Sequence, residues 1–209
     1  KCYNIIRKFL SNKINLVPNK AFLISNSYIV NDFFNNIINS RIVYKGTIDL
    51  TIEKTKIFKN IRKSYKSLIN WGIKSFDIVS IDRNNYSLEN FLKFKDLHFK
   101  ASGRETRSKK TWDIQAQMII ENRAFLVLAF DQMKLIAGVF IQHDCNNAFY
   151  GVAASDRDIM KEGKSLTHST LWYAINVAKE KGINLFSFGD ISPSDDVKLN
   201  NINLFKKGF

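Results

Sequence analysis

Three apolar runs in the middle of the chain constrain its fold more than any other feature. They cover residues 124–130, 134–142 and 148–154, and only the short polar stretches DQMK and DCNN join them. Strands joined by so few residues form hairpins, so neighbouring runs should pair in antiparallel fashion. The sequence therefore predicts a three-stranded antiparallel meander at the centre of the protein.

A helix and one more strand are predicted after this meander. The helix extends from Ser165 to about Lys181 and is closed by Gly182, and the stretch NLFSFGDI follows as a strand. A helix of this length between two strands serves as a crossover connection. We therefore predict an α/β (α+β) protein with a mixed, mostly antiparallel sheet that is flanked by helices.

The stretch 52–71 is predicted to form one amphipathic helix that Gly72 ends. Its apolar residues recur at spacings of four, four and three, which places on one face Ile57, Ile61, Tyr65 and Leu68. A second stripe on this helix is basic: Lys59, Arg62, Lys63 and Lys66. Two interpretations of the stripe stay open, a solvated outer face or a surface that binds phosphate or lipid head groups. No acidic residue occurs from Lys54 to Lys74, which favours the second interpretation.

A strand and two helices are predicted between this helix and the meander. FDIVSID is the strand, residues 87–102 are the first helix, and Thr111 is the expected N-terminal cap of the second, WDIQAQMIIENR. The stretch GRETRSKKTW lies between the helices, and its Arg104 and Arg107 carry guanidinium groups suited to phosphate or carboxylate. The alternative is a surface loop whose arginines pair with nearby acids.

The chain is strongly basic, with 32 Lys and Arg residues against 19 Asp and Glu and a formal net charge of +13. Such a field favours an anionic partner or an anionic membrane surface. The apolar runs are too short to span a bilayer, and Lys1 in place of a methionine suggests a trimmed chain without a signal peptide. Cys2 and Cys145 match neither a metal site nor a disulfide scaffold. We therefore expect a cytoplasmic protein without a metal, with peripheral membrane contact left open.

Three further positions are candidates for a site. His168 shares a helical face with Leu171 and Trp172, so it is predicted chiefly as a packed residue, with a substrate contact as the alternative. Asp190 ends a strand, where it could accept a proton from an amine, and Lys206 could hold an anionic carbonyl or phosphate group. The stretch EGKS lacks the first glycine of a phosphate-binding loop, so we reject a nucleotide hydrolase.

The order of the predicted elements resembles the GNAT acyltransferase fold: a strand, two helices, a meander, a crossover helix and another strand. Three stretches look more closely like the Fem-type peptidyl transferases, which add amino acids to peptidoglycan precursors: TIDLTIEKTKIFKNIRKSYKSLINWG, LTHSTLWYAINVAKEKGINLFSFGD and NLFKKGF. On this resemblance residues 1–50 are a remnant of a first GNAT-like subdomain. Residues 51–209 are then a GNAT-like transferase domain that stops before its closing C-terminal strands.

The resemblance implies transfer of an acyl or aminoacyl group onto an amine, without a metal. The family's Phe-Lys element at the substrate site corresponds to Phe205 and Lys206, with Asp190 as the expected proton acceptor. The family's basic helix would contribute Arg62 and Lys63 to an anionic substrate. Further residues expected in the same cleft are Arg104, Arg107 and Tyr150.

The donor stays open between aminoacyl-tRNA and acyl-CoA, because only the central glycine of the acyl-CoA loop pattern is kept within residues 160–165. The resemblance implies as acceptor an anionic small-molecule or lipid-linked precursor of the cell envelope, with tRNA as a further partner and no DNA. Two alternatives remain. One is an acyl-CoA-dependent N-acetyltransferase that acts on a nucleotide sugar, and the other is a non-catalytic GNAT-fold module that binds RNA or anionic lipid.

Overall fold

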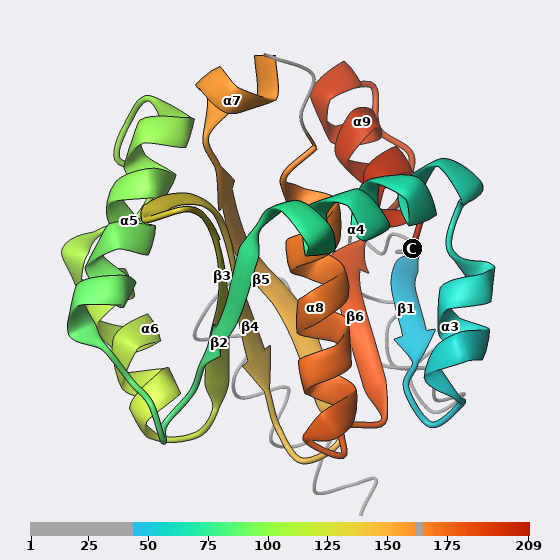
Figure 1. Cartoon of the computed structure of the whole chain (residues 1–209), viewed down its shortest axis with the longest axis horizontal. Helices are drawn as coiled ribbons and strands as arrows, with labels where there is room; N and C mark the ends of the chain where they lie inside the picture. Colours follow the sequence, from blue (N-terminus) through green and yellow to red (C-terminus); the bar gives the residue numbers. More distant parts are fainter. Residues whose placement is uncertain (1–43, 162–164) are drawn as a thin grey trace, which may run out of the picture. The chain divides into compact units, whose positions relative to one another are not determined.

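The computed structural model describes residues 44–161 and 165–209 (Figure 1). The chain divides into two compact units, Lys1–Ile42 and Val43–Phe209, and every element described below belongs to the second. Most of the expected N-terminal segment 1–50, up to residue 43, lies outside the described residues. Its last part, Lys45–Asp49, forms a strand of the sheet.

The described residues form one sheet of six strands in the order β1-β6-β5-β4-β3-β2. The bounds of these strands are β1 Lys45–Asp49, β2 Asp77–Ile81, β3 Ala124–Asp131, β4 Lys134–His143, β5 Asn147–Ser155 and β6 Leu185–Asp190. The predicted meander is confirmed, because β3, β4 and β5 pair in antiparallel register through their short connections. The mixed, mostly antiparallel sheet is also confirmed, since β5 and β6 form its parallel pair.

The parallel pair is short. Among the described residues, Asn147–Phe149 of β5 pair with Leu185–Ser187 of β6, and the register stops there. β5 nevertheless continues to Ser155, and β6 continues to Asp190 with β1 as its partner. The sheet therefore opens between β5 and β6 at their C-terminal ends.

Helices cover both faces of this sheet (Figure 1). Their bounds are α3 Lys54–Asn60, α4 Lys63–Ser75, α5 Leu88–Ser102, α6 Lys109–Ile120, α7 Arg157–Lys161, α8 Thr167–Glu180 and α9 Val197–Lys206. α5 and α6 contact one face of the meander strands, whereas α8 lies on the other face with α4 packed against it. The crossover between β5 and β6 is made by α8, as predicted.

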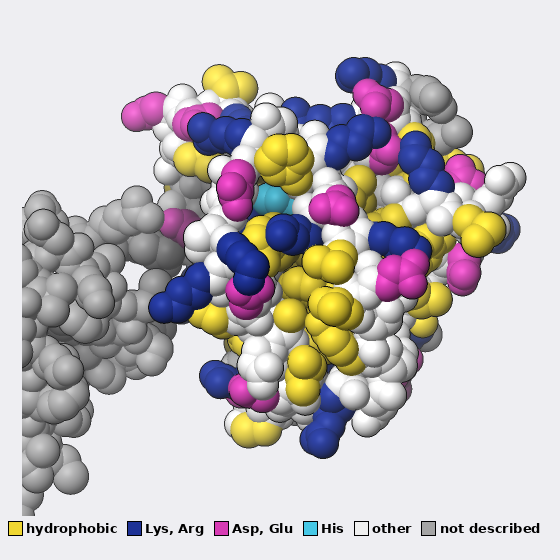
Figure 2. Space-filling view, turned by 90° about the vertical axis from the view of Figure 1, so that its left-hand side faces the viewer, with side chains coloured by type: hydrophobic (Ala, Val, Ile, Leu, Met, Phe, Trp, Pro, Cys, Tyr) yellow, Lys and Arg dark blue, Asp and Glu magenta, His cyan; other side chains and the backbone are white. Residues whose placement is uncertain are grey.

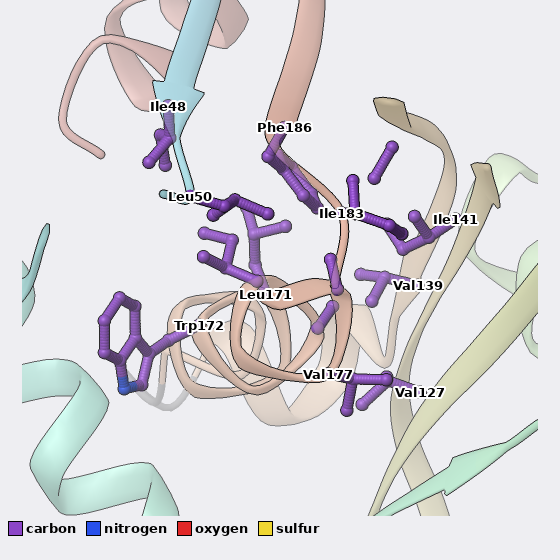
Figure 3. Packing of buried hydrophobic residues seen from close by; sticks show 14 of the residues in the cluster. Ile48, Leu50, Val127, Val139, Ile141, Leu171, Trp172, Val177, Ile183 and Phe186 are labelled. Carbon is purple, nitrogen blue, oxygen red and sulfur yellow. The ribbon is translucent and has the colours of Figure 1, made fainter. Parts of the chain in front are cut away.

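Strand β3 shows why the sheet needs cover on both faces, because all of its residues from Ala124 to Ala129 are buried. Val127 packs in the cluster around α8, whereas Leu126 and Leu128 pack in the cluster beneath α5 and α6. Figure 3 shows the first cluster, with Val177 of α8 against Val127. Complete burial of a side chain of this kind stabilises a fold by roughly 1.5–3 kcal/mol.

The predicted helix 52–71 is wrong in its continuity. Two helices, α3 and α4, occupy this stretch, and the backbone is extended at Ile61 and Arg62 between them. The Arg62 N–H donates to the carbonyl oxygen of Gly208 at 2.9 Å, a tertiary bond that a continuous helix would forbid. The four cations of the predicted basic stripe are therefore shared between two helices and their junction.

The predicted stop at Gly72 is also wrong, because this glycine lies inside α4. Gly72 faces Ser169 of α8, and a Cβ atom here would overlap the serine side chain. Glycine is therefore needed for the close approach of α4 and α8 rather than to end a helix.

Two helix starts differ from the sequence interpretation. α6 is capped by Ser108, whose Oγ accepts the N–H of Thr111 at 3.3 Å, so Thr111 is a helical residue and not the cap. α9 was not predicted at all. Asp196 caps it by accepting the N–H groups of Lys198 and Leu199.

Candidate functional site

Aromatic side chains gather where β5 and β6 separate. The ring of His168 lies 4.2 Å from the Tyr65 ring, 5.1 Å from the Phe205 ring and 6.0 Å from the Phe209 ring, measured between centroids. Phe188 of β6 continues the contact, 5.9 Å from Phe209 and 6.1 Å from Tyr150 of β5. We call these six rings the aromatic cluster: Tyr65, Tyr150, His168, Phe188, Phe205 and Phe209.

His168 lies in the first turn of α8. The Oγ of Ser165, three residues earlier, forms a hydrogen bond with the Nδ1 of His168. Its Nε2 is buried and has no hydrogen-bond partner among the described residues. Burial lowers the pKa of His168 from 6.5 to about 4, so the imidazole is neutral at neutral pH. A neutral ring with one unused nitrogen can accept or donate one hydrogen bond to a ligand.

Arg62 lies beside the aromatic cluster. Its guanidinium carbon is 5.1 Å from the centroid of the Tyr65 ring, and its N–H holds the carbonyl oxygen of Gly208. Gly208 in turn packs so closely on Tyr65 that a Cβ atom would overlap the ring. The chain segment Phe205–Phe209 is thus tied to the start of α4, where Lys63 is exposed.

Lys206 and Asp190 are neighbours at the same end of β6. The Lys206 Nζ donates to the main-chain oxygen of Asp190 at 2.9 Å, and the Asp190 Oδ1 accepts the N–H of Ser192 at 2.7 Å. Burial lowers the pKa of Lys206, and the Asp190 carboxylate opposes this shift. Burial raises the pKa of the Tyr150 hydroxyl and so keeps the phenol neutral.

Arg104 and Arg107 lie elsewhere, in the connection between α5 and α6. Arg107 Nη1 donates to His98 Nε2 at 2.9 Å, and its guanidinium carbon is 5.9 Å from the centroid of the Trp112 ring. Arg104 lines a separate hollow of about 230 Å³ together with Phe99. Figure 2 faces the side of the molecule that carries α5 and α6, and Figure 1 shows α9 and the junction of α3 and α4 on the other side.

The expectation of one shared cleft is therefore corrected. The structure brings together Arg62, Tyr150, His168, Asp190, Phe205 and Lys206, with Lys63 at the margin. Arg104 and Arg107 are separated from them, because α5 and α6 cover the opposite face of the sheet from α4 and α8. There, His98 and the Trp112 ring contact the Arg107 guanidinium.

Sequence reasoning missed the role of Asp156, the residue after β5. Its side chain is 1% exposed and pairs with Lys134 at 2.9 Å and Lys100 at 3.5 Å. Burial acts to raise its pKa, but hydrogen bonds from Lys134 and from the N–H groups of Asp158 and Ile159 outweigh burial and lower the pKa to about 2. This ion-pair network fixes the chain where it leaves β5. One signal in the sequence could have identified Asp156: an acidic residue directly after a strand and at the start of a short helix.

The described residues give two further findings about membranes and metals. None of their helices has both the length and the hydropathy that a bilayer span requires. They also contain no group of three or more His, Cys, Asp or Glu side chains that could hold a metal ion.

Comparison with known proteins rests on structure alone. No protein-family model matches the chain, and no curated protein matches it in sequence. The crystal structure of FemX superposes with a TM-score of 0.67 at 11% identity, over 98% of this chain and 73% of FemX. L-PGS from Bacillus licheniformis gives 0.55 at 13% identity, over 80% of this chain and 56% of that protein.

An aminoglycoside acetyltransferase from an uncultured soil metagenomic sample, in complex with sisomicin, is similar over a smaller part. Its TM-score is 0.50 at 14% identity, over 65% of this chain and 88% of the acetyltransferase. The chain spans little more than half the length of L-PGS. These likenesses, together with the parallel pair that opens between β5 and β6, show that the chain has a GNAT-like fold.

Proposed function

We propose that the chain transfers an acyl or aminoacyl group onto the amine of an anionic cell-envelope precursor or nucleotide sugar. One observation carries this proposal: two cations lie at the aromatic cluster, Lys206 bonded to the end of β6 and Arg62 over the ring of Tyr65. The similarity to FemX and to L-PGS supports the transfer of an aminoacyl group in particular.

The reaction requires an amine nitrogen to attack the carbonyl carbon of an ester or thioester. A C–N bond forms, the C–O or C–S bond breaks, and the nitrogen loses a proton. In its protonated form, Lys206 would donate a hydrogen bond to the oxyanion of the tetrahedral intermediate. At that step the Lys206 Nζ would leave the main-chain oxygen of Asp190 and donate to the oxyanion instead.

Asp190 is the proposed proton acceptor. Its Oδ1 accepts the N–H of Ser192, which orients the carboxylate. It lies next to Lys206 in space, so one residue would handle the proton while the other stabilises the oxyanion. General base catalysis of this kind contributes about 10²–10⁴-fold to a rate.

The remaining residues of the site are proposed to bind substrate. Arg62 and Lys63 would hold phosphate or carboxylate groups of the donor or acceptor. His168, Tyr150 and Phe205 would line the reaction chamber, exclude water and position the amine. Positioning two reactants supplies about 7–11 kcal/mol in the best cases.

Binding and turnover together test this proposal. Thermal-shift measurements with acetyl-CoA, UDP-sugars and aminoacyl-tRNA identify the ligand class, and transfer of a labelled acyl group from the stabilising donor then measures activity. Stabilisation by aminoacyl-tRNA with turnover supports the Fem-like reaction, and stabilisation by acetyl-CoA with turnover supports a sugar N-acetyltransferase. Stabilisation by RNA or lipid without turnover from either donor contradicts the proposal in favour of a non-catalytic binding module.

A further inference from the structure

Helix α5 has an exposed face on which apolar and charged residues form two separate rows. The apolar row consists of Leu88, Leu92 and Phe99, whose side chains are 59%, 44% and 55% exposed. Their spacings of four and seven residues place them within about 40° of one another around the helix axis. Figure 2, which faces this side of the molecule, shows apolar side chains gathered together with side chains of both charges beside them. A partner could cover this apolar surface.

The charged row of α5 alternates in sign. It consists of four exposed residues that lie about 80–140° from Leu88 around the helix axis: Glu89, Lys93, Asp96 and Lys100. Their charges cancel, although the chain as a whole has a formal net charge of +13. Lys95, at the edge of the apolar row, is half-buried. This face of α5 can therefore approach another basic surface with less repulsion than the net charge of the chain would suggest.

We propose that this face of α5 is the contact of a homodimer, in which the α5 helices of two copies pack antiparallel across a two-fold axis. Such an axis places each row beside the same row of the second copy and reverses its direction. The charged row reads minus, plus, minus, plus, so the reversed row is its complement. Glu89 then lies opposite Lys100 of the second copy, and Lys93 lies opposite Asp96 of the second copy. Every charged contact across the axis joins opposite signs.

The apolar row fits the same arrangement. Leu88 and Phe99 are equidistant from a point between residues 93 and 94, and the charged pairs are centred one residue further along. The axis therefore brings Leu88 of each copy onto Phe99 of the other, with the two Leu92 side chains between these contacts. A hollow of about 230 Å³, lined by Phe99 and Trp112, lies at this end of the row and would receive Leu88 of the second copy.

The two acids of the charged row favour a second copy over other partners. A phosphodiester backbone or an anionic bilayer would attract Lys93 and Lys100, but Glu89 and Asp96 would repel it. An unrelated protein has no reason to match a pattern that is its own complement when reversed. That property is what a symmetric contact between identical surfaces requires.

Two of the cations already form ion pairs within the chain. The Lys93 Nζ lies 2.7 Å from a carboxylate oxygen of Glu89, and the Lys100 Nζ lies 3.3 Å from Asp158 and 3.5 Å from Asp156. The Lys93 side chain is 47% exposed and that of Lys100 is 58% exposed. Because an ammonium group has three donors, each lysine can also bind an acid of the second copy.

The proposed contact lies away from the candidate site. α5 covers the opposite face of the sheet from α4 and α8, which carry Tyr65 and His168 of the aromatic cluster. The dimer would therefore leave the site of each copy uncovered. Dimerisation is independent of the proposed reaction and is measured without it.

Sedimentation equilibrium of the full chain over a range of protein concentrations tests the inference. Two variants reverse one charge each, Lys93→Glu and Asp96→Lys. Alone, each variant places like charges at both contacts that the axis creates between positions 93 and 96. In an equimolar mixture of the two variants, both contacts join opposite charges, because each variant supplies the sign that the other lacks.

A third variant, Leu92→Ser, tests the apolar row. Its matched control is Leu204→Ser on α9, where the exposed fraction is 53% against 44% for Leu92. Thermal unfolding of each protein confirms that it is folded.

We expect the wild type to form dimers, with a dissociation constant at least about tenfold higher for Lys93→Glu, Asp96→Lys and Leu92→Ser when each is alone. The equimolar mixture and Leu204→Ser should associate as strongly as the wild type. A wild type that is monomeric at every concentration overturns the proposal, and so does a mixture that associates no more strongly than its components. Dimers that all three substitutions leave intact would assign the contact to another surface and would also overturn it.

Discussion

The Lys206 side chain donates a hydrogen bond to the main-chain oxygen of Asp190, 2.9 Å away, and so bridges the last turn of α9 and the end of β6. This hydrogen bond holds the lysine at the end of β6, where β5 and β6 separate. Since Ser192 also donates its N–H to the Asp190 Oδ1, hydrogen bonds connect Asp190 to both Ser192 and Lys206.

Lys206→Met should remove the oxyanion donor while it keeps the length of the side chain. We expect kcat to fall by about 10²–10³-fold, the magnitude typical of the loss of one such donor. Steady-state kinetics of labelled acyl transfer measure the effect. Lys110→Met on the exposed surface of α6 is the control and should retain full activity. Equal kcat values for Lys206→Met and the wild type contradict the role.

Asp190→Asn should abolish proton acceptance but keep an oxygen that accepts the Ser192 N–H. We therefore expect kcat to fall by about 10²–10⁴-fold with an unchanged thermal midpoint. Direct binding measurements show whether substrate affinity is preserved. Normal turnover by this variant would assign the proton to another acceptor.

His168 should make stability depend on pH. Its pKa is about 4 in the folded protein and 6.5 as the ordinary value, so the unfolded chain binds more protons between these two pH values. The stabilising effect of the neutral ring is complete above pH 6.5 and is lost as the pH falls from 6.5 toward 4. Urea unfolding at pH 7 and pH 4.5 should show a smaller acid loss in His168→Gln than in the wild type. Parallel losses in the two proteins contradict the buried neutral imidazole.

Asp156→Asn should destabilise the protein by about 1–3 kcal/mol, because the buried side chain loses its charge-assisted hydrogen bonds from Lys134 and from the N–H groups of Asp158 and Ile159, whereas Lys134 and Lys100 are exposed and stay solvated. The pKa of Asp156 is lowered from 3.8 to about 2, so its contribution is present above pH 3.8 and is lost as the pH falls toward 2. Asp158→Asn is the matched control, since its side chain is 65% exposed, and its effect on the free energy of unfolding should be much smaller. Chemical denaturation measures both variants, and similar losses would contradict the distinction.

Gly72→Ala tests the packing of α4 on α8 by the sign of its effect. Alanine inside an exposed helix is about 1 kcal/mol better than glycine. At position 72 the added Cβ overlaps Ser169, so we expect destabilisation by about 1–3 kcal/mol. Ser169→Gly in the same chain should recover part of this loss. A stabilised Gly72→Ala would mean that the two helices are farther apart.

The fold was predictable because each of its central elements is indicated by residues within that element. The meander rests on three apolar runs with short polar connections, and the crossover helix is long and almost wholly apolar on the side that it buries. The break at Ile61–Arg62 was not predictable, because the hydrogen bond that replaces helix continuity comes from Gly208, far along the chain. Helix α9 was missed because none of its residues is buried, so it lacks the ordinary periodic pattern.

The candidate site was predictable only in part. Lys206, Phe205 and Arg62 came from a resemblance of local motifs, and they do lie near one another. The grouping with Arg104 and Arg107 failed, because charge alone does not tell which side of a sheet a loop occupies. His98, which holds Arg107 in place, is ten residues before the helix cap and carries no motif that links the two.

One measurement tests the central claim most directly: transfer of a labelled acetyl or aminoacyl group to an amine-bearing envelope precursor or nucleotide sugar, by wild type and Lys206→Met in parallel. The account predicts label in an amide of the acceptor with the wild type and about 10²-fold less with the variant. Label transferred equally by both proteins, or by neither with any donor that the protein binds, would contradict it.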